Sequence, residues 1–143
     1  MLSFKKILVP YDGSSYAKKA LATAADLALL IPGAKLFIAT VTPAEQPKEK
    51  VRLTSASADD TPKKNPGTIL LEEAEALLPK GVPHETILRA GDAGDELVTL
   101  TLEKEFDLIV MGSRGRGALK SLLMGSVSSH LASNSKCTIM IVK

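Results

Sequence analysis

A glycine-rich segment in the last third of the chain has the clearest chemical potential. Gly112, Gly115 and Gly117 directly follow an apolar run at 106–111. Glycines after a strand let backbone amides approach a phosphate closely, because no side chain stands in the way. The spacing fits neither a Walker loop, since Ala and Leu follow Gly117, nor a dinucleotide loop, whose last glycine is replaced by Lys120. On these glycines alone, an ordinary turn is the alternative to an anion site.

A second group, Gly125 and Ser126, precedes a helical pattern that contains Val127 and Leu131. We expect Ser126 to be the N-cap of this helix, whose first-turn amides then form an anion site. Three basic side chains near these groups could neutralise phosphate charge or simply be solvated: Arg114, Arg116 and Lys120.

Strands and helices alternate in the predicted secondary structure that must position these groups. Continuous apolar runs predict strands at 7–10, 35–42, 86–88, 106–111 and 138–142. Helical spacing predicts helices that run from Ser14 or Ser15 to Pro32, from 68 to 78, from Gly91 and Asp92 through Leu100, and from 126 to about 135. Strands that are apolar throughout indicate a parallel sheet with helices on both faces. The sequence therefore predicts one doubly wound α/β domain over residues 1–143.

The segment 43–67 interrupts this alternation. Pro, Lys, Ser, Asp and Thr dominate it, and no apolar periodicity is visible. We expect a flexible loop there, which is either functional or only solvated.

Two loops offer the most functional groups beyond the carboxyl ends of the predicted strands. One is Asp-Gly-Ser-Ser at 12–15, after the first strand, and the other is the glycine-rich segment after the fourth. In an open parallel sheet, ligands bind beyond the carboxyl ends, where the strand order reverses. If both loops border one crevice, the first and fourth strands are neighbours and the order is 3-2-1-4-5. An Asx-turn is the alternative role for Asp12.

The composition favours a cytoplasmic globular protein over a membrane or nucleic-acid-binding one. The 143 residues are 45% hydrophobic and 24% charged, with no signal-peptide core and no run near the roughly 18 apolar residues of a membrane helix. Aromatic residues make up only 3%, which argues against base stacking, and a net charge of +2 favours no partner. Basic residues cluster at 48–64 and 114–116, but no nucleic-acid reader motif accompanies them. The single Cys137 has apolar neighbours, so we expect a buried thiol.

The spacing of the two glycine groups resembles a known family signature. Gly112-Ser-Arg-Gly115, nine further residues and Gly125-Ser126 are similar to the G-x-x-G-x9-G-[ST] pattern of ATP-binding universal stress proteins. The resemblance covers essentially the whole chain, from the segment 6–14 to Cys137 and the last predicted strand. It implies the same sheet order, 3-2-1-4-5. The departures are the segment 43–67, which varies in the family, and Thr138, where many relatives have Pro after the Cys.

The resemblance also implies roles for individual residues. Pro10 and Asp12 would border the adenosine, with the Asp12 carboxylate near the ribose or near a magnesium or manganese ion bound through ATP. Val41 and Met111 would offer backbone contacts to adenine, while the glycines and Ser126 would bind phosphates. The full expected nucleotide site consists of Pro10, Asp12, Val41, Met111, Gly112, Arg114, Gly115, Gly125, Ser126 and Val127.

Three classes of function remain open at this stage. The protein could be an ATP-binding regulatory or stress factor, a slow ATPase or self-phosphorylating protein, or a dimeric scaffold that does not use nucleotide. Efficient phosphoryl transfer needs metal ligands, a positioned nucleophile and cationic groups, and no convincing general base is visible. His130 lies four residues after Ser126, but such pairs arise readily by chance. We therefore favour a binding protein over an enzyme.

The last predicted strand also suggests a partner. In the expected order, the segment 138–142 is an apolar edge strand, and an open edge invites pairing with a second copy. The resemblance implies such a homodimer as well. Cover by the chain's own helices is the alternative.

Overall fold

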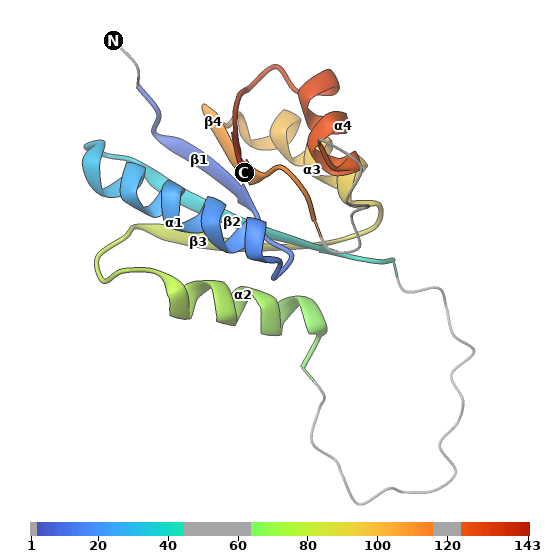
Figure 1. The fold of residues 1–143 in the computed structure, drawn as a ribbon, viewed down its shortest axis with the longest axis horizontal. Helices are drawn as coiled ribbons and strands as arrows, with labels where there is room; N and C mark the ends of the chain where they lie inside the picture. The colour runs from blue at the N-terminus through green and yellow to red at the C-terminus, as the bar shows by residue number, and fades with distance from the viewer. Residues whose placement is uncertain (1–2, 45–63, 116–123) are drawn as a thin grey trace, which may run out of the picture.

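Five parallel strands form one sheet in the order β3-β2-β1-β4-β5, as predicted (Figure 1). The computed structural model describes residues 3–44, 64–115 and 124–143. Most of the predicted loop 43–67, together with Arg116, Gly117 and Lys120, lies outside these residues. The strands are β1 Lys6–Pro10, β2 Lys35–Thr42, β3 His84–Ala90, β4 Leu108–Gly112 and β5 Thr138–Val142.

Four helices cover the two faces of this sheet, as the continuous apolar strands indicated. Figure 1 shows α1 and α2 on one side of the sheet and α3 and α4 on the other. Their bounds are α1 Ser15–Leu30, α2 Pro66–Leu77, α3 Ala93–Lys104 and α4 Ser126–Asn134. Among the described residues, no helix combines the length and the apolar composition that a bilayer-spanning segment needs.

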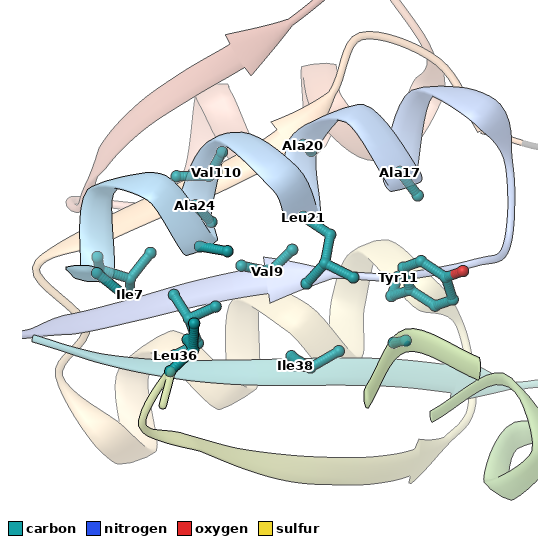
Figure 2. Close-up of a cluster of buried hydrophobic side chains, with 14 of the residues drawn as sticks. Ile7, Val9, Tyr11, Ala17, Ala20, Leu21, Ala24, Leu36, Ile38 and Val110 are labelled. Atoms are coloured by element: carbon teal, nitrogen blue, oxygen red, sulfur yellow. The ribbon is translucent and has the colours of Figure 1, made fainter. Parts of the chain in front are cut away.

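Alternate strand residues supply two separate cores, one on each face. On the α1 side, small residues of the helix let it lie close to β1, so that Ala20 and Ala24 pack near Ile7 and Val9 (Figure 2). The opposite face buries Leu8 and Ile109 with residues of α3 and α4. Because both faces are covered, β1, β2 and β4 are apolar along nearly their whole length.

Some predicted boundaries were wrong, and side-chain contacts explain two of them. Helix α2 begins at Pro66, two residues before the predicted start, because the Asn65 side chain caps the Gly67 N–H at 2.8 Å. Strand β4 begins at Leu108 rather than Phe106, since the Asp107 carboxylate accepts hydrogen bonds from the Lys5 and Lys6 amides at 2.9 Å.

Two other differences follow from position at the sheet edges. Strand β3 pairs with β2 along its whole length and is longer than the predicted 86–88. As an edge strand it has no fully buried residue, and polar residues flank its short apolar run, so the run marks only its middle. Cys137, just before the other edge strand, is half-buried rather than buried. That partial burial raises the pKa of the Cys137 thiol to about 11.

Candidate functional site

A cavity of about 470 Å³ lies at the carboxyl end of the sheet, between the ends of β1 and β4. This volume falls within the range of small-molecule sites. All ten residues of the expected site line it: Pro10, Asp12, Val41, Met111, Gly112, Arg114, Gly115, Gly125, Ser126 and Val127. The sheet order explains the convergence, because β1 and β4 are neighbours and their following loops leave the sheet at the same edge.

Asp12 joins the β1 side of the cavity to the glycine-rich segment. Its Oδ1 accepts a hydrogen bond from the Ser14 N–H at 2.9 Å, so the Asx-turn expected as an alternative does form. Ser14 then caps α1, its Oγ accepting from the Ala17 N–H at 3.1 Å. The other carboxylate oxygen lies 2.7 Å from the position that a Cβ would occupy on Gly115. Asp12 therefore has both a structural role and a place in the cavity wall.

Gly112, at the end of β4, is required by packing as well as by the cavity. A Cβ at this position would lie 2.6 Å from the Tyr16 Cβ and 2.9 Å from the Tyr16 backbone carbon. Real Cβ atoms do not approach so closely, and backbone cannot move aside as a flexible side chain can. Helix α1 thus packs directly against the first glycine of the motif.

Helix α4 forms the opposite wall, and its cap differs from the predicted one. The N-cap is Gly125, not Ser126, which is the first helical residue and is exposed. The Gly125 N–H donates to the Ser113 carbonyl at 2.6 Å, and this contact fixes where the helix begins. Among the four helices described, α1, α2 and α3 have side-chain caps, whereas α4 has none. Within the described part of the chain, the N-cap of α4 therefore supplies no side-chain acceptor to the first-turn amides, which lie at the border of the cavity.

Sequence reasoning missed six residues that also line the cavity. They are Tyr11, Ala17, Ala39, Ala93, Leu97 and Ser128. Ala93 and Leu97 belong to α3, which follows a loop with few functional groups. The available signal was topological: every strand of a parallel sheet ends at the same edge, so the helix after β3 also starts there.

Comparison with known proteins identifies the family. The model of the Universal stress protein family matches residues 3–143. The chain belongs to the universal stress protein family. The universal stress protein YxiE of Bacillus subtilis is 34% identical over 149 residues, which cover 98% of this chain and 99% of that protein.

Solved structures of universal stress proteins share the fold, and some contain nucleotides. A universal stress protein crystallised in complex with cAMP superimposes with a TM-score of 0.70 at 27% identity, covering 99% of this chain and 98% of that one. A family member from Arabidopsis thaliana, solved with AMP bound, has a TM-score of 0.63 at 19% identity, covering 97% of this chain and 91% of that one. Homologues of this universal stress protein thus bind adenine nucleotides.

His130 contacts a neighbouring helix and does not line the cavity. Its Nε2 lies 3.1 Å from Asp95 Oδ1 on α3, and its Nδ1 lies 3.4 Å from the Asn134 amide nitrogen. Gly94 on α3 leaves room for this ring, because a Cβ there would lie 2.8 Å from His130 Cδ2. In this universal stress protein, His130 therefore connects α4 to α3.

Proposed function

We propose that this universal stress protein binds ATP in the cavity at the carboxyl end of its sheet and acts as a nucleotide-dependent regulatory factor in a stress response. One observation carries the proposal. Residues from the ends of β1, β2 and β4 and from the start of α4, far apart in sequence, line a single cavity of nucleotide size.

The glycine-rich side of the cavity suits the phosphates. The space beside Gly125 is narrow, since a Cβ there would lie 3.3 Å from the Arg114 Cα and 3.6 Å from the Gly115 amide nitrogen. Uncapped amides of α4 border the same region, and such amides favour anions. The Arg114 guanidinium adds a positive charge among the lining residues.

The other side of the cavity suits an adenine ring. Val41 and Ala39 of β2, Met111 of β4 and Leu97 of α3 form an apolar lining. A nucleobase can bury its faces against such residues and direct its edges to backbone groups. The related protein in complex with cAMP supports adenine as the base.

A metal ion, if used, would arrive with the nucleotide. Within the described ranges, no group of three or more His, Cys, Asp or Glu side chains is placed to hold an ion. Mg²⁺ typically binds one or two carboxylates together with substrate phosphates, and Asp12 offers one carboxylate beside Gly115. The residues present therefore fit a magnesium or manganese ion held jointly by Asp12 and ATP.

Calorimetry of the purified protein with ATP, ADP and AMP, each with and without Mg²⁺, tests the proposal. We expect saturable binding of ATP, and the absence of binding by every adenine nucleotide at millimolar concentration would refute it. A timed phosphate-release assay then separates a regulator from a slow ATPase. A regulatory role further requires that ATP alter a conformational equilibrium, which hydrogen exchange with and without ATP would detect.

We also propose that β5 pairs with β5 of a second copy. This strand is at the sheet edge, and Met140 within it is 37% exposed. An open apolar edge strand favours pairing with another chain. Light scattering combined with gel filtration measures the resulting mass.

A further inference from the structure

The phosphate side of the proposed site consists of two pieces of backbone that are separate in the described structure. One piece is 112–115, at the end of β4, and the other is 125–127, at the start of α4. The chain between them, 116–123, lies outside the described residues. The hydrogen bonds between the two pieces therefore show how they are held together.

Ser128 makes one of these hydrogen bonds from within α4. Its Oγ donates to the Gly112 carbonyl oxygen at 2.8 Å, and the residue is only 2% exposed. A helical serine can instead donate to a carbonyl of the preceding turn of its own helix. Here the donor is directed across to β4, so α4 is tied to the strand that begins the glycine motif.

The peptide unit between Gly112 and Ser113 is held at both ends. Its carbonyl accepts from Ser128, and its N–H donates to the Val142 carbonyl of β5 at 2.9 Å. A peptide unit is planar, so two fixed ends determine its orientation. The direction in which the following glycine segment leaves β4 depends on that orientation.

Two further contacts complete the arrangement. Tyr16 of α1 packs against Gly112, which stops the strand end from shifting toward α1. The Ser113 carbonyl accepts from the Gly125 N–H at 2.6 Å, immediately before the uncapped first turn of α4. Ser128 and Gly125 thus connect α4 to consecutive carbonyls of the glycine segment.

We propose that Ser128 is a positioning residue for phosphate binding: its bond to the Gly112 carbonyl sets the relative placement of the glycine segment and the first turn of α4. This inference rests on the proposed nucleotide function. Ser128 borders the cavity, but its buried hydroxyl is used by the Gly112 carbonyl, so it acts through the backbone. Most of the apolar side of the cavity comes from other elements, with Ala39 and Val41 of β2 and Leu97 of α3.

The test compares two variants of matched shape, Ser128→Thr and Ser128→Val. Thr keeps the hydroxyl and Val does not, while both add similar bulk at a buried position. We expect Ser128→Val to bind ATP roughly three- to tenfold more weakly than Ser128→Thr, the range expected for one buried neutral hydrogen bond. Ser128→Ala should bind ATP more weakly than the wild type by a similar factor. The exposed neighbour Ser129 provides the control Ser129→Ala, which should bind ATP like the wild type.

Adenosine separates positioning from a general structural role. Because adenosine lacks phosphates, its affinity, measured by NMR titration to millimolar concentration, should be the same in the Thr and Val variants. Equal ATP affinities in these two variants, or an equal loss of ATP and adenosine affinity in Ser128→Val, would overturn the inference. If the wild type itself binds no nucleotide, the proposed function fails first, and calorimetry on the wild type reports that separately.

Discussion

The carboxylate of Asp12 and the backbone of Gly115 are in direct proximity across the candidate site, and a Cβ on Gly115 would lie 2.7 Å from Asp12 Oδ2. The loop after β1 and the loop after β4 therefore leave no room for a side chain at Gly115 unless Asp12 shifts. Gly115 is not among the residues with positive φ, so its importance comes from space rather than from backbone strain.

Replacing Gly115 tests this close approach. We expect Gly115→Val to weaken ATP binding by about tenfold to a hundredfold, because branched bulk would displace the carboxylate and obstruct the phosphates. Gly115→Ala should cost less, since only the movable end of Asp12 must shift. Calorimetry measures the affinities, and thermal unfolding should show both variants folded. If Gly115→Val binds ATP like the wild type, the phosphates are bound elsewhere.

Replacing Asp12 by Asn separates its charge from its structural role. Asn keeps an oxygen that can accept from the Ser14 N–H, so the turn into α1 is preserved. We expect the enhancement of ATP affinity by Mg²⁺ to fall by roughly tenfold in Asp12→Asn, because a charged ligand of the ion is lost. Metal-free ATP should bind more tightly, since a negative charge near the phosphates is removed. An unchanged magnesium dependence would contradict a role for Asp12 in ion binding.

The His84 side chain predicts a pH-dependent contribution to stability. Its Nδ1 lies 2.9 Å from the Val82 carbonyl oxygen and its Nε2 lies 2.8 Å from Glu75 Oε2. Both partners accept hydrogen bonds, so only the doubly protonated ring satisfies both, and these contacts, led by the one to Val82, raise the pKa of His84 above 6.5. The stabilisation is therefore complete below pH 6.5 and is lost as the pH rises through the folded-state pKa.

Urea unfolding of the wild type and of His84→Gln measures this contribution. The difference in unfolding free energy between them should be larger at about pH 5.5 than at about pH 8.5. Glu75→Gln should reduce the same pH dependence, because the carboxylate is one of the causes of the raised pKa. A difference that grows with pH would show that the sign is wrong.

The proposed pairing through edge strand β5 predicts that a charge introduced on this strand prevents dimer formation. We expect Met140→Lys to convert a dimer to a monomer, since a lysine on an edge strand opposes pairing with another chain. The matched control is Leu88→Lys on β3, the other edge strand, where the side chain is 39% exposed. Light scattering with gel filtration reports the masses. A monomeric wild type, or dissociation by the β3 variant alone, would contradict pairing through β5.

Much of the fold could be predicted because the relevant signals are local. Apolar runs identified every strand, and the loops after 7–10 and 106–111 held so many functional groups that they implied neighbouring strands, which the sheet order confirms. Edge strand β3 was predicted too short, because polar residues flank its short apolar run, with His84 and Glu85 before it and Arg89 after it.

By itself, the sequence predicted the strands from their apolar periodicity and the order 3-2-1-4-5 from the two loops rich in functional groups, because these patterns are local to the chain. The site residues came from the resemblance of the glycine spacing to the universal stress protein signature, and all ten line one cavity. Only the tertiary structure decided that Gly125 rather than Ser126 begins α4, that Ala93 and Leu97 reach the cavity, and that Ser128 holds the Gly112 carbonyl. These relationships depend on where along the sheet each helix packs its side chains against those of the strands. That position is set by packing among all the elements together, and no local pattern encodes it.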